Sequence, residues 1–347
     1  MPTRTRLGSL CCIGSLFTCF AYSGYSYDPL EDQSLTIIEE SPLRFDGTLE
    51  VLFLGNTTLY ITDGTTHLIT DAFISRPNKA TVLFGELSAP DPDELKKMLN
   101  DFGVNELDAI LVGHSHYDHA LDAPYVAKAF GAEVMGSDSY GNYHIGTRIP
   151  EIKDKWISVP CEGRTENFGK FTVTFVKSKH VTPKYSVQKK LEGQITEEFS
   201  LPARNASFKT GYVFVIHISH ENGRIIITTT AGAKEDALDE TRHKADVVFL
   251  GIGTLAEETE ENQKTYWNEI VGVSAPDLVI PTHWDDFTRK LDRGLKPRPM
   301  FIDDLEQSME FVKSKAEEIS KTGAKMDLQL MDIGSVIRLE KGKVLSN

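Results

Sequence analysis

A dense cluster of metal-ligand side chains, placed directly after a short apolar run, constrains this chain more than any other feature. Residues 108–113, Asp-Ala-Ile-Leu-Val-Gly, are short, partly β-branched and end in glycine, so they predict a buried strand. Residues 114–119 follow with the sequence His-Ser-His-Tyr-Asp-His. Layered α/β folds tend to place functional sites on loops that leave the carboxyl ends of strands. The cluster therefore predicts a functional site at one edge of a sheet.

The residue types in the cluster indicate metal binding. Neutral imidazole nitrogens and carboxylate oxygens are good ligands for Zn²⁺ and similar ions. His114 and His116 are two residues apart and can converge on one ion from a bent loop. Asp118 and His119 then point elsewhere and could hold a second ion. The His-x-His-x-Asp-His spacing is a specific pattern, so we prefer metal binding to the alternative of a histidine-rich surface loop.

The rest of the chain predicts strands and helices alternating around this cluster, which favours an α/β fold with helices on the outer face of a sheet. Asp63-Gly64 between two apolar runs predicts a hairpin. Tyrosine-rich residues 137–146 are expected to form a packed aromatic turn. The predicted strands cover residues 48–54, 58–62, 67–70, 108–113, 133–135, 171–176, 212–218, 224–229, 245–251 and 277–281, with strand-like runs within 328–339. The predicted helices cover residues 91–102, 123–130, 260–271 and 303–319.

The composition fits a globular protein and excludes some classes of partner. Apolar residues make up 40% of the 347 residues and charged residues 25%, which is enough for a sizeable core. The formal net charge of −14 argues against a nucleic-acid or anionic-membrane binder, because phosphate contacts need clustered Lys and Arg. A small substrate is compatible with this charge, since its site can be locally positive. The sequence sets no oligomeric state.

The first residues have the pattern of an export signal. Arg4 and Arg6 precede an apolar, small-residue stretch over 7–22, and Ala21-Tyr22-Ser23 offers a small-x-small cleavage site. The stretch is too short and too rich in glycine and serine for a stable membrane span. We therefore expect residues 1–23 to be the cleaved signal peptide of an exported protein, either periplasmic or extracellular. Lipid anchoring through Cys19 and the absence of processing are the alternatives.

Export would leave a mature chain without an internal disulfide. Cys11, Cys12 and Cys19 lie in the signal segment, so Cys161 alone would remain. Residues 24–46 are polar and irregular, and they are expected to form a linker or an arm laid over the domain. We expect a single domain over residues 47–347.

The histidine motif and the order of features around it resemble the metallo-β-lactamase-fold hydrolase superfamily. The resemblance covers about residues 45–340 and is specific for the superfamily rather than for one member. It implies a four-layer αββα sandwich. It also implies two ligand sets, in which His180 follows the strand at 171–176 and His283 lies in Thr-His-Trp-Asp-Asp-Phe. The sets are His114, His116 and His180 for a first ion, and Asp118, His119 and His283 for a second.

Two more residues stand at positions that this family uses around its metals. The resemblance implies that Asp71, at a strand end, hydrogen-bonds to the site and fixes an imidazole. Thr230 stands where many members carry an aspartate that bridges both ions. Threonine is a poor metal ligand, so either solvent alone would bridge the ions or the second ion would bind weakly.

Residues 181–209 form a long polar stretch without periodicity. Such long loops are usually functional or disordered, and this one directly follows a predicted ligand, so we expect it to cover the site. Its polar side chains include Lys184, Tyr185, Lys189, Lys190 and Arg204. The basic ones would either meet an anionic group of the substrate or form a solvated face.

Two three-residue ligand sets leave coordination positions open, which is typical of catalytic metal sites. The resemblance thus implies a metal-dependent hydrolase in which a metal-bound hydroxide cleaves an ester, lactone or phosphodiester bond. Asp118 and His283 are the predicted catalytic residues, with Asp118 orienting the attacking group. Zn²⁺ is the expected cofactor, at two ions per chain, although Mn²⁺ or iron also suits such ligands. The expected substrate is a small or lipid-like molecule. The alternatives are a β-lactamase that cleaves a cyclic amide, a non-catalytic metal- or ligand-binding protein, and an iron-dependent redox enzyme.

Overall fold

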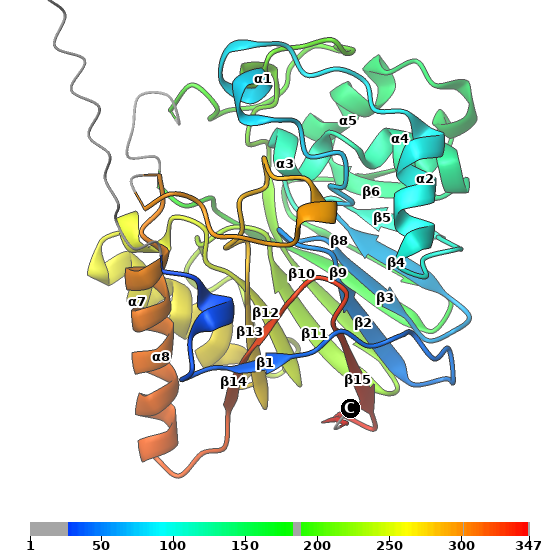
Figure 1. Ribbon diagram of the computed structural model, residues 1–347. Helices are drawn as coiled ribbons and strands as arrows, with labels where there is room; N and C mark the ends of the chain where they lie inside the picture. The colour runs from blue at the N-terminus through cyan, green and yellow to red at the C-terminus, as the bar shows by residue number, and fades with distance from the viewer. Residues whose placement is uncertain (1–26, 183–188, 301, 346–347) are drawn as a thin grey trace, which may run out of the picture.

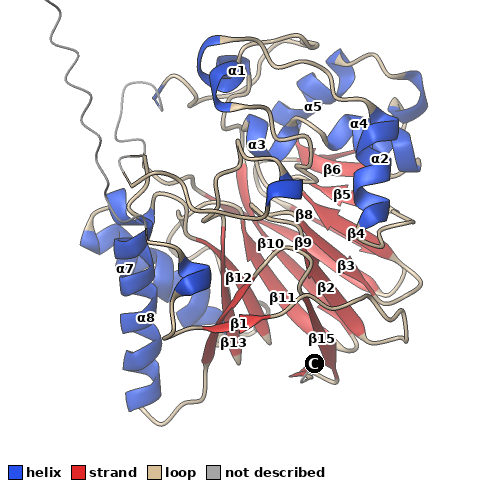
Figure 2. Cartoon of the chain, viewed as in Figure 1, coloured by secondary structure: helices blue, strands red, loops and turns tan. Residues whose placement is uncertain are grey.

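The computed structural model describes residues 27–182, 189–300 and 302–345, which form two mixed sheets lying face to face between two groups of helices (Figures 1 and 2). This is the predicted α/β architecture, a four-layer αββα sandwich, and the prediction is confirmed. The expected signal peptide over 1–23 lies outside the described residues. No described helix is both long and apolar enough to cross a membrane.

The first sheet begins with antiparallel hairpins and continues with parallel strands. Its strands are β2 (Leu49–Phe53), β3 (Leu59–Thr62), β4 (His67–Thr70), β5 (Ala109–Leu111), β6 (Glu133–Ser137), β7 (Trp156–Val159), β15 (Val336–Glu340) and β16 (Lys343–Val344). They lie in the order β16-β15-β2-β3-β4-β5-β6-β7. The Asp63-Gly64 turn joins β3 to β4 with Thr62 opposite His67, as the hairpin signal predicts. β4 to β7 are parallel, so their carboxyl ends share one edge of the sheet.

The second sheet combines an antiparallel half with a parallel half. Its strands are β1 (Thr36–Ile38), β8 (Arg164–Phe168), β9 (Phe171–Ser178), β10 (Val213–His220), β11 (Gly223–Thr228), β12 (Val247–Gly251), β13 (Leu278–Thr282) and β14 (Asp327–Met331). They lie in the order β1-β14-β13-β12-β11-β10-β9-β8. Every residue of β12 and β13 is buried, because these parallel strands have helices on one face and the other sheet on the opposite face.

The helices cover the outer faces of the two sheets. They are α1 (Lys79–Phe84), α2 (Pro92–Asp101), α3 (Tyr117–Ala120), α4 (Ala123–Phe130), α5 (Asp138–Gly146), α7 (Glu260–Trp267) and α8 (Leu305–Lys321). Short 3-10 turns lie at Pro29–Glu31, Pro150–Ile152, Asn205–Ser207, Leu255–Glu257 and Leu291–Arg293, and a π turn at Asn268–Gly272 continues α7. Figure 1 shows α2, α4 and α5 beside β4 to β6, and α7 and α8 beside the second sheet. Figure 1 shows α1 at the top of the view, above α3.

The amino-terminal arm contributes a strand to the second sheet. β1 pairs in parallel with β14, with Ile37 opposite Leu330. Asp32 accepts hydrogen bonds from Lys313 Nζ on α8 at 2.8 Å and from the Tyr27 hydroxyl at 2.7 Å. The segment predicted as a linker or arm is therefore, from residue 27 onward, an arm that closes one edge of the sheet.

The prediction of a packed turn at residues 137–146 is wrong, because α5 occupies this segment. Ser137 caps the helix by accepting a hydrogen bond from Tyr140 N at 3.1 Å. The aromatic side chains then pack on one side, and the Tyr143 hydroxyl donates to Leu121 O at 2.8 Å. β7, β8 and α1 have no counterpart among the predicted elements.

Candidate metal centre

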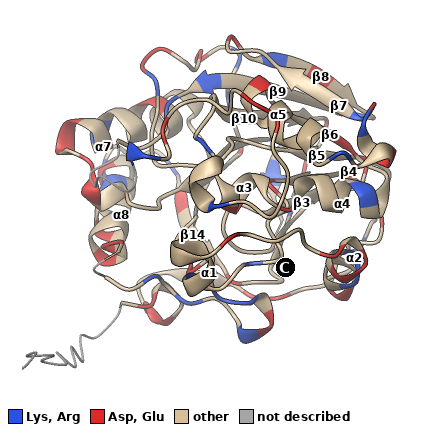
Figure 3. Ribbon diagram, turned by 90° about the horizontal axis from the view of Figure 1, so that it is seen from above, with Lys and Arg blue, Asp and Glu red and all other residues tan. Residues whose placement is uncertain are grey.

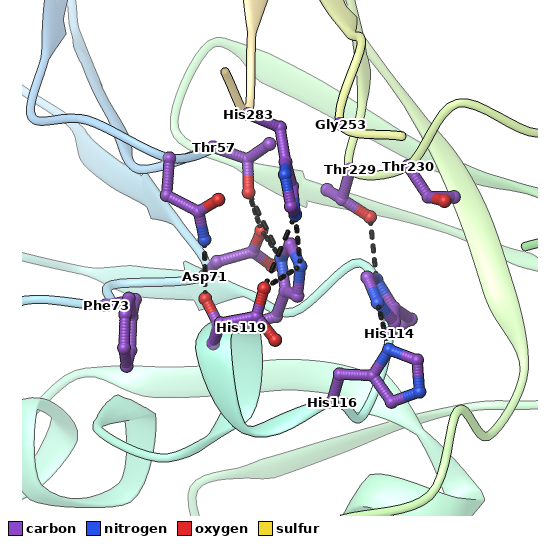
Figure 4. A network of polar contacts seen from close by, with 12 residues as sticks. Thr57, Asp71, Phe73, His114, His116, His119, Thr229, Thr230, Gly253 and His283 are labelled. Carbon is purple, nitrogen blue, oxygen red and sulfur yellow. Dashed lines mark hydrogen bonds and ion pairs between the residues drawn. The ribbon is translucent and has the colours of Figure 1, made fainter. Parts of the chain in front are cut away.

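The six predicted ligands come from three separate chain segments at the same edge of the sandwich. His114 and His116 follow β5, and the same segment continues into the short helix α3, which carries Asp118 and His119. His180 lies two residues after β9, and His283 is the first residue after β13. The first segment follows a strand of one sheet and the other two follow strands of the other sheet, so the ligands come from both sheets (Figure 4).

The structure brings all six residues together in the two predicted sets. His114, His116 and His180 form one group, and Asp118, His119 and His283 form the other. Within each group the ligand atoms lie within 4.8 Å of one another, and all six side chains are buried or nearly so. Their roles as metal ligands remain a prediction, which this geometry supports.

In the first set, hydrogen bonds decide which ring nitrogen faces the centre. His114 Nδ1 lies 3.0 Å from Thr229 Oγ1, and His180 Nδ1 lies 2.9 Å from Val181 O. His114 Nε2 in turn lies 3.2 Å from Nδ1 of His116. The far nitrogen of His116, Nε2, lies 3.1 Å from Thr210 Oγ1. One ring nitrogen of each imidazole therefore contacts an oxygen outside the histidine group, and the other nitrogen is available to bind an ion at its centre.

The second set is oriented by the predicted carboxylate, Asp71. Its Oδ2 lies 2.7 Å from His119 Nδ1, and its Oδ1 accepts the Gly113 N–H at 2.9 Å. His119 Nε2 thus points to the centre, where it lies 3.2 Å from both His283 Nε2 and Asp118 Oδ2. Asp71 occupies the place around the site that the sequence predicts for it.

The charge states of the cluster differ between the two sets. Burial, with the neighbouring imidazoles, lowers the pKa of His114 and His116 well below the ordinary value, and burial lowers the pKa of His180 to about 4. Burial acts the same way on His119, but the carboxylates of Asp118 and Asp71 outweigh it and raise its pKa to about 10. Burial opposes ionisation of Asp118, yet His119 and His283 hold its pKa well below the usual range.

This donor set fits a pair of divalent cations. The first set presents three neutral imidazoles, which is the form that binds metal. In the second set, two imidazole nitrogens face each other at 3.2 Å beside an ionised carboxylate, and a cation there would replace the proton that the carboxylates hold on His119. Three protein ligands per ion leave further coordination positions open.

The site lies at the base of a cavity of about 580 Å³. Its wall is formed in part by Leu191, Glu192, Gly193 and Gln194, so described residues of the segment 181–209 lie beside the site, and its role as a cover stays a prediction. Lys184 and Tyr185 lie outside the described residues. Lys189, Lys190 and Arg204 are described, and none of the three lines the cavity. Among the described residues, the cations that line it are Lys79, Lys177, Lys179 and Arg298.

Comparison with known families agrees with this geometry. The model of the metallo-beta-lactamase superfamily matches residues 51–247, which is more than half of the chain. The chain belongs to the metallo-beta-lactamase superfamily. Five of the six candidate ligands lie inside the matched range, and His283 lies beyond it.

Relatives of known sequence or structure are distant. A metal-dependent hydrolase of Staphylococcus aureus (strain JH9) is 25% identical over 244 residues, which cover 69% of this chain and 87% of that protein. Igni18, a metallo hydrolase of the archaeon Ignicoccus hospitalis, has a TM-score of 0.49 at 13% identity, covering 84% of this chain and 99% of its own. The metallo-beta-lactamase fold protein YhfI of Bacillus subtilis has a TM-score of 0.49 at 14% identity, and the match covers 84% of this chain and 100% of YhfI.

At the position where many superfamily members carry a bridging aspartate, two threonines share the contacts. Thr230 lines the cavity, and its Oγ1 accepts the Val181 N–H at 3.2 Å, directly beside His180. The neighbouring Thr229 is the one that contacts a predicted ligand, His114. Thr230 therefore contacts the backbone beside His180, and Thr229 contacts a candidate ligand directly.

Sequence analysis missed the turn at Asn56-Thr57, which supports all three residues of the second set. Asn56 Nδ2 donates to Asp118 O at 2.7 Å, and Asn56 O accepts the His283 N–H at 2.9 Å. Thr57 Oγ1 donates to Asp71 Oδ2 at 2.5 Å and lies 3.1 Å from His119 Nδ1 (Figure 4). Its place directly after β2, at the same sheet edge, is the only signal that the sequence offers.

The two aspartates after His283 have different surroundings. Asp285 is fully buried, forms an ion pair with Arg76 at 2.6 Å and accepts the Asn56 N–H at 2.6 Å. It fixes the β13 loop to the Asn56 turn. Asp286 lines the cavity beside Phe287, whose ring lies edge-on to that of His283 with centroids 5.7 Å apart.

Proposed function

We propose that this protein is a metal-dependent hydrolase that cleaves an ester, lactone or phosphodiester bond in a small or lipid-like substrate. The observation that carries this proposal is the pair of three-residue ligand sets at the base of a cavity of about 580 Å³. Catalytic metal sites keep open positions for water and substrate, whereas structural sites fill them with protein ligands. The superfamily assignment and the metal-dependent hydrolase among its relatives support the same conclusion.

Each side chain has a defined task in this proposal. Divalent ions held here would polarise the attacked group and make water acidic enough to attack it at neutral pH. Asp118 stays ionised beside His119 and His283, so its carboxylate can bind and orient the attacking water. His283 completes the set from the opposite sheet, and Asp71 keeps His119 in the tautomer whose Nε2 faces the centre.

We propose Zn²⁺ as the resident ion, with two ions per chain. Imidazole and carboxylate ligands suit zinc, and they also accept Mn²⁺ or iron when supply favours those ions. Thr230 supplies a hydroxyl where a bridging carboxylate would add a strong bond, so in this proposal either solvent alone bridges the ions or the second ion binds weakly.

Turnover of a small substrate panel tests the proposal. Zinc-loaded protein should hydrolyse at least one of a set of aryl esters, lactones and aryl phosphodiesters. His116→Ala and His283→Ala should each lower kcat/KM by about 100-fold or more, because each disables one metal set. His217→Ala is the matched control: His217 is a buried histidine on β10 whose Nε2 lies 3.2 Å from Lys244 O, away from both ligand sets.

Three results would contradict the proposal. Turnover that survives both ligand substitutions would place the reaction outside this centre. Hydrolysis of a chromogenic cephalosporin, with no ester, lactone or phosphodiester turned over, would make the protein a β-lactamase instead. A protein that binds both ions but hydrolyses no member of the panel would be a binding protein.

We propose further that the protein is exported and that residues 1–23 are removed. The proposal rests on the basic residues, apolar stretch and small-x-small site of the sequence. Amino-terminal sequencing of the protein from its native cell fraction tests it. A new terminus near residue 24 in a periplasmic or extracellular fraction supports export, and an intact Met1 in the cytoplasm contradicts it.

A further inference from the structure

An apolar strip on α1 lies at the mouth of the metal-site cavity. Among the described residues, the exposed large hydrophobic side chains are Phe45, Leu83, Phe84, Ile145 and Met300. Leu83 is 56% exposed and Phe84 86% exposed, at the end of α1. Leu83 itself lines the cavity, and so does its neighbour Val82. Met300, 55% exposed, lies between Arg298 and Ile302, which both line the cavity.

The apolar strip formed by Leu83 and Phe84 is followed, inside the cavity, by further apolar lining residues. Val181 and Leu191 line the cavity from the covering loop, and Phe287 and Ile302 line it from the loop after β13. The Phe287 ring lies 5.7 Å from that of His283, so apolar surface extends from the rim to the second ligand set. Figure 3, the view from above, shows α1 near α3, the short helix that carries Asp118 and His119.

The backbone holds α1 in this position. Asn78 caps the helix by accepting the Thr81 N–H at 3.1 Å. Immediately after the helix, Leu87 and Ala203 exchange backbone hydrogen bonds of 2.7 and 3.1 Å, which tie the α1 segment to the covering loop. The exposed side chains are thus held in place beside the opening. Exposed apolar patches of this kind, next to a cavity, are typical of ligand-binding sites.

We infer that the substrate is an amphiphile whose alkyl or acyl chain lies along Leu83, Phe84 and the inner apolar wall while its polar head reaches the metal centre. This inference rests on the proposed hydrolase function and names its class of substrate. Cavity-lining cations such as Lys179 suit an anionic head, whereas Arg298, which also lines the cavity, is already ion-paired with Asp303 at 2.6 Å. An ester or phosphodiester of a long-chain alcohol or acid has this combination of parts.

Binding of alkyl phosphates to the zinc-loaded full-length protein tests the inference without any turnover. Calorimetric titration with ethyl, butyl, octyl and dodecyl phosphate should give affinities that rise with chain length, roughly fourfold for each methylene that becomes buried. Leu83→Ser and Phe84→Ser should each weaken binding of the dodecyl compound about tenfold. Both should leave binding of ethyl phosphate unchanged, since the short compound does not reach α1.

Ile145→Ser is the matched control. Ile145 is 47% exposed on α5 and does not line the cavity, so its loss should leave every affinity unchanged. Equal affinities for ethyl and dodecyl phosphate would overturn the inference. So would an equal loss in Ile145→Ser and Phe84→Ser, because binding would then not depend on α1. Self-association of the parent that Phe84→Ser abolishes, without chain-length dependence, would assign the strip to contact between copies of the chain.

The outcomes separate this inference from the proposed function. Chain-length-dependent binding without hydrolysis of any ester would retain the apolar site and overturn the hydrolase. Hydrolysis of short esters without chain-length-dependent binding would retain the hydrolase and overturn the amphiphile.

Discussion

Residues around the metal centre are held in unusual backbone conformations. Asn56, Asp71, Ala72 and His283 all have positive φ values, between 52° and 60°. Non-glycine residues in this region cost of order 1 kcal/mol each and persist where surrounding contacts fix them. Here the contacts are the hydrogen bonds that join the Asn56 turn to Asp118, Asp285 and His283. Four of the eleven described non-glycine residues with positive φ therefore lie around the candidate metal centre, where ligand direction matters.

Replacing Asp71 by asparagine should weaken the second metal set selectively. The amide oxygen would stay with the Gly113 N–H, so the amide nitrogen would face His119 Nδ1 and favour the wrong tautomer. We expect a 10- to 100-fold loss of affinity for the second ion, with the first ion retained. Competitive metal titration measures both steps. Two ions bound with unchanged affinities would show that Asp71 does not orient His119.

Gly253 gives His283 the space that its ring needs. A Cβ at residue 253 would lie 2.4 Å from His283 Nδ1, which has no hydrogen-bond partner among the described residues. Gly253→Ala should therefore displace the ring, lower occupancy of the second set and reduce kcat/KM by about tenfold or more. Gly272→Ala serves as the control, because a Cβ there meets only Asn268 Cβ, at 3.9 Å. Equal metal content in both variants would contradict this role of Gly253.

Single residues were predictable where the pattern is contiguous in the sequence. The histidine cluster carries its chemistry within six residues, and the family order adds His180 and His283. Thr57 and Thr229 show no such pattern, because each acts through one hydroxyl on an imidazole 62 or 115 residues away. The strand order of the first sheet brings Thr57 to His119, and the packing of the two sheets brings Thr229 to His114.

At the scale of elements, the ends of strands place the candidate ligands. The elements differ in how well the sequence predicts them. Prediction succeeded for strands with continuous apolar runs, such as β12 and β13, since burial on both faces leaves a clear signal. It failed for β7 and β8, whose residues are mostly exposed or half-buried. It also failed for α1, because six residues with an exposed Leu83 and Phe84 give no helical stripe.

The stability that the amino-terminal arm adds to the fold should depend on the negative charge of Asp32. Burial would raise the pKa of this carboxyl, but hydrogen bonds from Lys313, Ser34 and Tyr27 hold it well below its usual range. Asp32→Asn should lower the free energy of unfolding by about 1 kcal/mol at pH 7. Because the folded pKa lies below the unfolded value of about 3.9, the contribution is complete above about pH 5 and is lost as the pH falls.

Urea unfolding at pH 7 and at successively lower pH measures this dependence. The difference between parent and Asp32→Asn should shrink below about pH 4, where the carboxyl becomes protonated in the unfolded chain. Asp154→Asn, at an exposed position, is the control and should show no comparable difference at any pH. If the difference in free energy of unfolding between parent and Asp32→Asn grew as the pH falls, it would contradict a stabilising role of the ionised Asp32 carboxylate.

At the scale of the whole molecule, each candidate ligand set takes residues from both sheets. The first set takes His180 from the second sheet and the second set takes His283 from it, whereas the other ligands follow β5 of the first sheet. Ions bound at these positions would link the two halves of the sandwich. The sequence could not show that the ligands come from two facing sheets, because the way the sheets pack against each other depends on the complete hydrophobic core.

Removing the metal should therefore destabilise the whole fold. At 100 times its dissociation constant, one bound ion contributes about 2.7 kcal/mol. Treatment with a chelator should lower Tm by about 5 °C or more, and added Zn²⁺ should restore it. Calorimetry of parent and His116→Ala measures this, and the variant should show a smaller shift. An unchanged Tm after proven metal loss would mean that the ions do not link the sheets.

The metal content of the purified protein tests the central claim most directly. Elemental analysis should find close to two transition-metal ions per chain in the parent and in the buried-histidine control His217→Ala. His116→Ala and His283→Ala should each hold about one ion, because each substitution removes a ligand from a different set. One ion or fewer in the parent, unchanged by His283→Ala, would contradict a two-metal centre built from these six residues.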